Sequence, residues 1–191
     1  MTSWTYWRLA KITVWALALT LTSSMGHLYA ANVDQVTQLA KTGRCPGCDL
    51  SSADLRKIKL KGADLSGANL AGADLRGVNM TAANLKKANL TGAKIRHANL
   101  SEANLTDSDL RRSDLRSADL RHAIIVRADL AKADCSNAQF DGVMISRTNF
   151  AGARGVPSEL AEQESWKDEP KIVDVQSPSV VDRVWKFLFN W

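Results

Sequence analysis

The sequence predicts an all-β fold in which short segments stack into a coil, and two observations lead to this prediction. From position 50 to position 150 every fifth residue is large and apolar with few exceptions, and this register continues through 21 units without an insertion. A small residue, usually alanine, stands two positions before each large one, and Asp or Asn usually stands between them. A period of five fits neither an amphipathic helix nor an ordinary strand.

The geometry of an extended chain indicates how one such unit packs. Residues two apart face the same side, so Ala53 and Leu55 point one way while Asp54 and Arg56 point the other. If each unit turns a corner, four units close a square coil with the leucines and alanines inside. Burial of these side chains must offset the ordering of the chain. The coils therefore have to stack, and the two open ends need covers.

Four segments carry a resemblance to a known family. They read Ala-Asp-Leu-Ser-Gly at 63–67, Ala-Asn-Leu-Ala-Gly at 68–72, Ala-Asp-Leu-Arg-Gly at 73–77 and Ala-Asn-Leu-Thr-Gly at 88–92. These segments resemble the repeats of pentapeptide-repeat proteins. The resemblance implies a right-handed quadrilateral β-helix, a solenoid with four repeats to a coil and about five coils. The block from Cys45 to Arg154 would form this solenoid.

The N-terminal segment 1–30 is typical of a secretory signal peptide. Arg8 and Lys11 give it a basic start, Ile12–Leu21 form its apolar centre, and residues 28–30 offer a cleavage site. The apolar run is short for a membrane span. We therefore expect an exported protein, periplasmic or secreted, and an uncleaved leader that anchors the chain to the membrane is the alternative.

The charge balance argues against nucleic acid as a partner. Without the leader the chain has 23 Lys and Arg against 20 Asp and Glu, which is a small positive excess. The repeat block, Cys45–Arg154, has 17 basic and 12 acidic residues. These numbers do not indicate the basic stripe of a nucleic-acid-binding surface.

Residues 31–44 are expected to form a short amphipathic helix that caps the first coil. The apolar residues have helical spacing, and Gly43 is a natural stop. They are Val33, Val36, Leu39 and Ala40.

Cys45 and Cys48 follow in repeat register, so both are expected to point inward at the first corner. In an exported protein a disulfide between them would clamp the first turn. The spacing also permits redox exchange or half of a zinc site. Cys135 occupies a core position and is interpreted as a small buried hydrophobe. We expect no bound metal and no cofactor.

The outward positions of one face carry a ladder of arginines. Stacking of the coils places four of them in one column, with a second column two residues earlier. The arginines are Arg56, Arg76, Arg96 and Arg116, and the second column is Asp54, Asp74, Lys94 and Asp114. One hypothesis makes this face a site for an acidic partner, and the other makes it a set of structural ion pairs. Lys94 breaks the alternation, and with Arg96 and His97 it forms an unbalanced basic spot.

Apolar residues also occupy three outward positions that are polar elsewhere in the repeats. Ile124, Val126 and Met144 are expected to form a small exposed patch, and another segment or molecule usually packs on such a patch. The acidic, Pro-containing segment 155–179 is interpreted as a linker or cap, with one short helix over Ser158–Trp166.

The last segment, 180–191, is expected to form an aromatic amphipathic helix. Its apolar residues include Val181, Val184, Trp185, Leu188 and Trp191. Three roles remain open for it: folding back onto the apolar patch, joining a second copy or a partner protein, or lying in a membrane surface.

The residues give no support to catalysis. His97 and His122 are 25 positions apart, and the serines have no general base near them. The Asp and Asn residues before the core positions are interpreted as turn-stabilising groups, and the glycines as repeat corners. The sequence therefore predicts a non-enzymatic scaffold of the bacterial envelope with a protein partner. The alternatives are a topoisomerase-directed DNA mimic, as in some members of the family, and a thiol redox protein built on the two N-terminal cysteines.

Overall fold

The computed structural model describes residues 33–161 and 171–173. Residues 33–42 are helical. Three further elements are described: β1 (Val143–Ile145) lies within the last coil, and α2 (Ser158–Ala161) and β2 (Lys171–Val173) come after it in the chain. The expected leader, the C-terminal aromatic helix and the second half of the expected helix at 158–166 lie outside the described residues. No helix of the described part is long and apolar enough to cross a bilayer.

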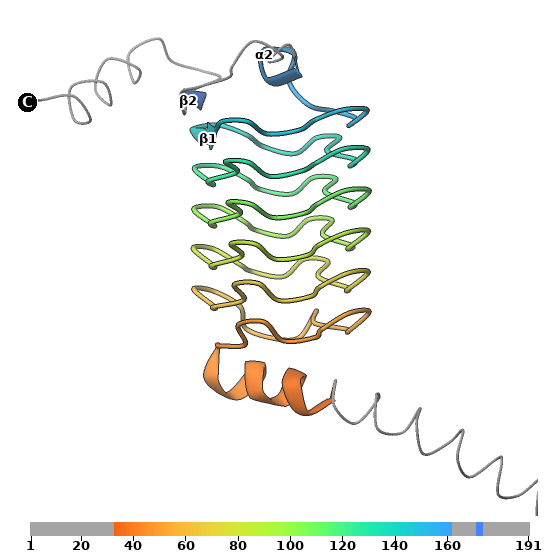
Figure 1. Ribbon diagram of the computed structural model, residues 1–191, viewed down its shortest axis with the longest axis vertical. Coiled ribbons are helices and arrows are strands. Elements are labelled where there is room, and N and C mark those ends of the chain that lie inside the picture. Colours follow the sequence, from red (N-terminus) through yellow and green to blue (C-terminus); the bar gives the residue numbers. More distant parts are fainter. Residues whose placement is uncertain (1–32, 162–170, 174–191) are drawn as a thin grey trace, which may run out of the picture. The chain divides into compact units, whose positions relative to one another are not determined.

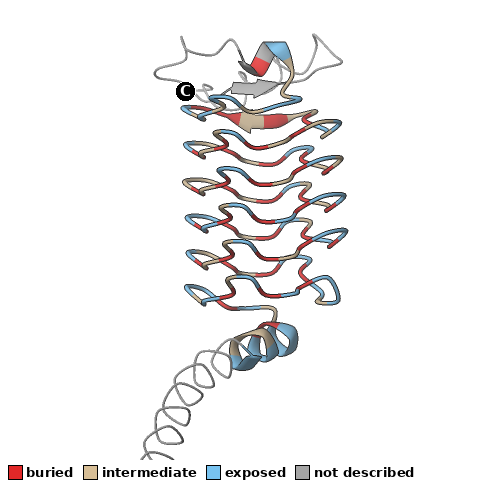
Figure 2. Ribbon diagram, turned by 90° about the vertical axis from the view of Figure 1, so that its right-hand side faces the viewer, coloured by how far each residue is buried: buried red, intermediate tan, exposed pale blue. Residues whose placement is uncertain are grey.

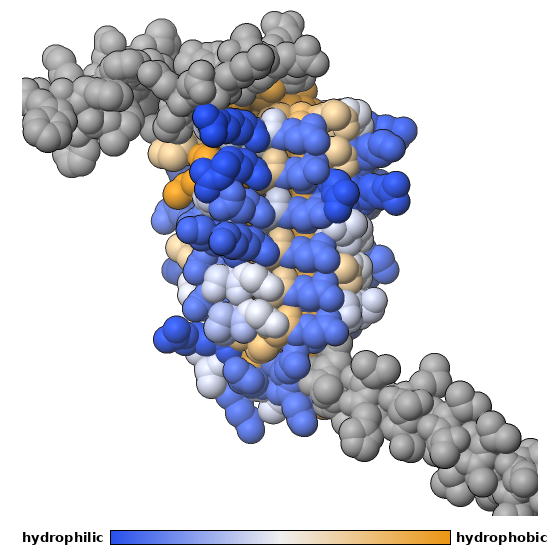
Figure 3. All heavy atoms as spheres, in the orientation of Figure 1, coloured by the Kyte–Doolittle hydropathy of each residue, from blue (hydrophilic) through white to orange (hydrophobic). Residues whose placement is uncertain are grey.

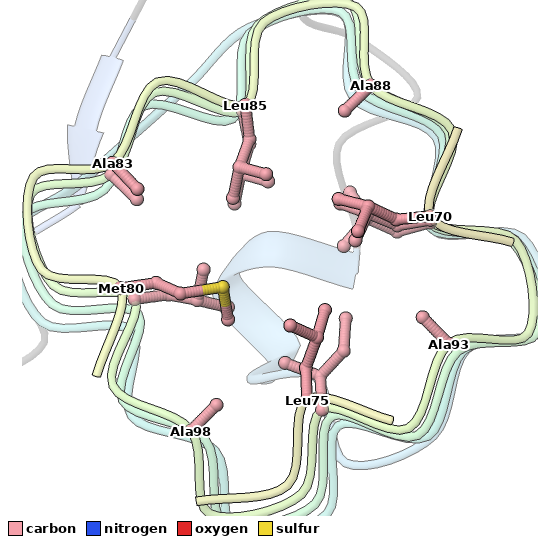
Figure 4. Packing of buried hydrophobic residues seen from close by; sticks show 14 of the residues in the cluster. Leu70, Leu75, Met80, Ala83, Leu85, Ala88, Ala93 and Ala98 are labelled. Carbon is pink, nitrogen blue, oxygen red and sulfur yellow. The ribbon is translucent and has the colours of Figure 1, made fainter. Parts of the chain in front are cut away.

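The repeats stack into a β-helix solenoid. Asp54 bridges to Asp74, Asp74 to Lys94 and Lys94 to Asp114. The described residues form 18 such isolated bridges, all of them parallel and between residues 20 positions apart. Each coil therefore contains four repeats, and Figure 4 shows its four-sided outline. Figure 1 shows the coils stacked one above another. The predicted coil and its register are confirmed.

The inside of the coil is a column of large side chains surrounded by small ones (Figure 4). Leu70, Leu75 and Met80 are fully buried, as are Ala73 and most other residues at the two inward positions. Figure 2 shows this alternation of buried and exposed residues along every coil. Among the large inward residues, Phe150 of the last repeat is only partly buried, and among the smaller ones Cys48, Ile58 and Ala138 are partly buried.

Serine replaces alanine at two inward positions without leaving an unpaired polar group. Ser108 Oγ donates a hydrogen bond to the carbonyl oxygen of Leu105 at 2.6 Å. Ser113 Oγ donates to the carbonyl oxygen of Leu110 at 2.7 Å. Both hydroxyls thus bond to the turn that they follow, and burial of the serines is tolerated.

The corners are β-turns with a left-handed residue. The N–H of Ala53 donates to the carbonyl oxygen of Leu50 at 3.1 Å, and Ser52 within this turn has a φ of 57°. Glycine occupies many such corners, as expected, but 13 non-glycine residues of the described part of the chain also have positive φ. This conformation costs a non-glycine residue on the order of 1 kcal/mol. The hydrogen bonds of the neighbouring coils hold these residues in place.

The Asp and Asn residues before each core position stabilise the turns, as predicted. Asp54 Oδ1 accepts a hydrogen bond from the N–H of Arg56 at 3.2 Å, and Asn69 Oδ1 accepts one from Ala71 at 3.2 Å. The side chains also bond between coils, since Asn89 Nδ2 donates to Asn69 Oδ1 at 3.1 Å.

The helical residues before the coil contribute one side chain to the core. Leu39 is fully buried, whereas Val36 is only partly buried and Val33 and Ala40 are exposed. The apolar face is therefore narrower than the spacing predicts. The helix stops at Gly43, whose N–H donates to the carbonyl oxygen of Leu39 at 2.8 Å with a φ of 67°.

The last coil has a strand against its open edge. β1 pairs antiparallel with β2, and Met144 lies opposite Ile172 (Figure 1). Leu160 of α2 is fully buried in the same core. Segment 155–179, expected to be a linker or cap, thus contains a strand that its sequence does not predict. The unpaired hydrogen-bonding groups of the last coil explain why a strand adds at this place.

Candidate interaction face

Three of the four arginines in the predicted ladder are held by carboxylates. Arg56 donates from Nε to Asp54 Oδ1 at 2.9 Å and from Nη2 to Asp54 Oδ2 at 2.7 Å. Arg116 makes the same two bonds to Asp114 at 2.7 and 2.6 Å. Arg76 bonds to Asp74 in the same way. The guanidinium therefore meets the carboxylate through two parallel hydrogen bonds, the strongest geometry for this pair.

The pairs also contact the next coil. Arg56 Nε lies 3.6 Å from an oxygen of Asp74, and Arg116 Nε lies 3.9 Å from an oxygen of Asp134. The hydrogen bond from Arg116 holds the pKa of Asp114 below its usual value. The same bond raises the pKa of Arg116. These arginines thus form structural ion pairs, which favours the second of the two hypotheses for this face, and a role of Arg56, Arg76 and Arg116 in binding a partner stays a prediction.

Arg96 differs from the other three. Lys94 occupies the position of the carboxylate, and Arg96 forms no ion pair with any described residue. Its Nε donates instead to His97 Nε2 at 3.1 Å. All three side chains are exposed. We call Lys94, Arg96 and His97 the basic spot.

The backbone under the basic spot is regular. The N–H of Lys94 donates to the carbonyl oxygen of Ala73 at 2.9 Å, and the N–H of Ile95 donates to that of Asp114 at 2.8 Å. Figure 3 shows, for one side of the coil, how such stacking arranges hydrophilic side chains in vertical columns. We call the outward pair of residues that each coil contributes to the ladder a rung: Asp74 with Arg76, Lys94 with Arg96, and Asp114 with Arg116. The basic spot therefore has a fixed position between two rungs in which the arginine is paired with a carboxylate.

The predicted apolar patch is not freely exposed. Ile124, Val126 and Met144 all have intermediate burial. Ile124 and Met144 bridge to each other between coils, and β2 pairs alongside Met144. The patch is therefore partly rather than freely exposed, because neighbouring backbone covers part of it, and its role as a docking patch stays a prediction. The tail residues Val181, Val184, Trp185, Leu188 and Trp191, expected as its cover, lie outside the described residues.

Cys45 and Cys48 form a disulfide at the first corner. Cys45 is fully buried and Cys48 is partly buried against the core, which leaves little access for an exchange partner. Burial raises the pKa of the Cys135 thiol to about 12. Within the described residues, no three His, Cys, Asp or Glu side chains are placed to hold a metal ion.

The sequence analysis missed further ion pairs on other faces. Arg111 bonds to Asp109 and Arg121 bonds to Asp119 with the geometry of the ladder. These two pairs could have been predicted from the sequence, because the same motif, Asp-x-Arg, recurs at 54–56, 74–76, 109–111, 114–116 and 119–121. Arg127 pairs with Asp107 of the coil before it, and only knowledge of the stacking could have revealed this pair.

The coil, its five-residue register and its outward Asp–Arg pairs define the class of protein: a solenoid of five-residue repeats. The family described as pentapeptide repeats matches residues 48–86, 83–121 and 123–154, in eight copies. The chain belongs to the pentapeptide-repeat family, which implies a right-handed β-helix. The comparison with curated proteins yields no match.

Solved structures similar to this chain include other pentapeptide-repeat proteins. A protein of the cyanobacterium Cyanothece 51142 is 23% identical, with a TM-score of 0.40, and the match covers 64% of this chain and 92% of that one. One from Nostoc PCC 7120 is 34% identical with a TM-score of 0.34, covering 64% and 93%. QnrB1, a plasmid-mediated fluoroquinolone resistance protein, is 18% identical with a TM-score of 0.25, covering 61% and 70%.

Proposed function

We propose that this protein is an exported, non-enzymatic scaffold of the bacterial envelope whose basic spot binds an acidic segment of a partner protein. The observation that carries the proposal is the break in the ladder at Lys94. On the neighbouring coils each arginine forms an ion pair with the carboxylate two residues before it, whereas Arg96 forms no ion pair with a described residue and donates to His97.

The rigidity of the coil supports this role. Lys94 and Arg96 lie on either side of the fully buried Ile95, so the backbone that carries them does not have to be ordered when a partner binds. Preorganised charges lose less conformational entropy on binding. An acidic segment could bond to the guanidinium through two hydrogen bonds, as Asp114 bonds to Arg116.

Export is part of the proposal and rests on the N-terminal segment and the cysteines. The segment 1–30 has the basic start and apolar centre of a signal peptide. A disulfide such as that between Cys45 and Cys48 persists in oxidising compartments. Cleavage before Ala31, seen as the mass of the mature protein, would support export, and an intact N-terminus on a cytoplasmic protein would contradict it.

The topoisomerase-directed role of some family members receives less support. A DNA mimic requires an acidic surface, and the block Cys45–Arg154 has 17 basic and 12 acidic residues. The thiol redox alternative is disfavoured by the burial of Cys45.

Co-purification from cell envelopes tests the proposal. The parent chain is compared with the Lys94→Asp variant and with Lys86→Asp, an exposed lysine on another face. We expect the Lys94→Asp variant to lose the partner and the Lys86→Asp control to keep it. Equal recovery of the partner by all three proteins would overturn the assignment to the basic spot.

A version that ends at Ser179 separates the face from the tail. Retention of the partner by this version would agree with binding at the basic spot. Loss of the partner on truncation, with retention by Lys94→Asp, would make the C-terminal tail the docking element instead.

A further inference from the structure

Three lysines on the first coil form a second basic site, distinct from the basic spot. Lys57, Lys59 and Lys61 are all exposed. None of them forms an ion pair with a described residue. The carboxylates nearest in sequence have other partners: Arg56 bonds twice to Asp54, and Arg44 Nη2 lies 3.5 Å from Asp64 Oδ2. We call these three residues the lysine corner.

The backbone of the lysine corner departs from the rest of the coil. On the coil stacked next to it, the N–H of Gly77 donates to the carbonyl oxygen of Arg96 at 2.9 Å. The N–H of Met80 donates to the carbonyl oxygen of Asn99 at 2.7 Å. The equivalent N–H groups, those of Lys57 and Leu60, make no such bond to the next coil within the described residues. Lys57 also lacks the positive φ found at Gly77.

The charge of this face changes along the coil. Lys59 and Lys61 flank the buried Leu60, and residues two apart in an extended chain face the same side. The same two positions on the following coils carry Asn79 and Thr81, then neutral residues again. Further along they hold the Asp119–Arg121 pair and finally Gln139 with Asp141. Positive charge without a counter-charge is thus concentrated at the first coil.

We propose that the lysine corner docks the first coil onto a membrane surface that contains anionic lipid. Charge complementarity selects lipid as the occupant. The three lysines are exposed and lie within five consecutive residues of the first coil, so their ammonium groups suit a layer of anionic headgroups.

The expected membrane affinity is moderate. Each lysine near an anionic surface increases the partitioning of the protein onto that surface roughly fivefold, so three lysines increase it on the order of 100-fold. Such binding weakens with salt because the charges are exposed to solvent. Apolar segments of the chain, by contrast, would bind neutral and anionic vesicles alike and would not respond to salt in this way.

Vesicle co-sedimentation of the full chain tests this proposal. The vesicles are phosphatidylcholine alone, or one part phosphatidylglycerol in three, at low and high salt. The test variant is Lys57→Gln with Lys59→Gln and Lys61→Gln. The control is Lys86→Gln with Lys87→Gln and Lys132→Gln, which removes the same charge from three exposed lysines elsewhere on the coil. Thermal unfolding of each variant establishes that the coil is intact.

The expected result is a loss of roughly 100-fold in partitioning onto the anionic vesicles for the test variant alone. Parent-like binding by the test variant would overturn the proposal, and so would an equal loss by the control. Soluble heparin distinguishes lipid from other polyanions: binding to heparin that depends on the same three lysines, without dependence on phosphatidylglycerol, would contradict the assignment to lipid. None of these outcomes depends on Lys94.

Discussion

Arg96 and Arg116 occupy the same position on neighbouring coils, yet they have different environments. Arg116 donates two hydrogen bonds to Asp114, whereas Arg96 has Lys94 in the matching place and bonds only to His97. The backbone beneath both arginines is the same regular ladder. A single outward residue therefore decides whether a rung of this face is neutralised by the fold or remains available to another molecule.

The largest expected effect concerns the core that supports both rungs. Ile95 is fully buried between Lys94 and Arg96, and Ile95→Ala should lower the free energy of unfolding by about 3 kcal/mol through lost burial and the cavity left behind. Urea denaturation measures the change. The outward variant Lys94→Ala serves as a control and should change the free energy of unfolding by less than about 0.5 kcal/mol. Similar losses in the free energy of unfolding for Ile95→Ala and Lys94→Ala would contradict the assignment of Ile95 to the core and of Lys94 to the surface.

A smaller effect is expected at the corner that follows each rung. His97 has a φ of 58°, and the same corner of the coil below holds Gly77 with a φ of 69°. His97→Gly should stabilise the coil by about 1 kcal/mol, and Gly77→Ala should destabilise it by a similar amount. A β-carbon at Gly77 would have nothing within 4 Å, so this variant measures backbone strain alone. Melting temperatures that move in the same direction for both variants would contradict the interpretation.

Repair of the broken rung should have a still smaller effect on stability. Lys94→Asp places a carboxylate two residues before Arg96, as in the Asp114–Arg116 rung, and exposed pairs of this kind contribute about 0.2–1 kcal/mol. The free energy of unfolding should rise by that amount at low salt, and the gain should shrink at high salt. The reverse change, Asp114→Lys, should lower it. A stability loss from Lys94→Asp would show that Arg96 cannot adopt the paired geometry.

Acid should remove the stability that the Asp114–Arg116 pair contributes and that Lys94 and Arg96 do not. The bond from Arg116 holds the pKa of Asp114 below its ordinary value of 3.8. A carboxyl group with a lowered folded pKa stabilises the fold fully above the unfolded pKa, and this contribution disappears as the pH falls through the folded value. The parent coil should therefore lose stability below pH 3.8, and Asp114→Asn should lose slightly less. Urea titrations at a series of acidic pH values test this, and a pH dependence unchanged by Asp114→Asn would contradict it.

The coil could be predicted from the sequence because one spacing rule determines it. Leu55 and Ala53 recur every five residues, and this period fixes both the inward faces and the stacking of residues 20 apart. The pairing of Arg56, Arg76 and Arg116 was one of two open hypotheses, because the spacing sets their column but not the rotamer that lets each guanidinium reach back to its own Asp.

Other features depended on information outside the period. The left-handed corners at residues such as His97 contradict ordinary residue preferences, and only the neighbouring coils enforce them. β2 could not be predicted because Lys171–Val173 is a short segment, and its strand conformation depends on the unpaired edge of β1. The irregular backbone at Lys57 was hidden because the repeat register continues through it without an insertion.

The most direct test of the basic spot is a binding measurement between two immobilised forms of the coil and a soluble acidic polymer such as poly-glutamate. One form is the parent chain and the other carries Lys94→Asp, with Lys86→Asp as the control of equal charge. We expect Lys94→Asp to weaken binding about tenfold more than Lys86→Asp does, because the new carboxylate also occupies Arg96. Equal weakening by the two variants would show that only net charge matters, and it would contradict the claim that the broken rung is a binding site.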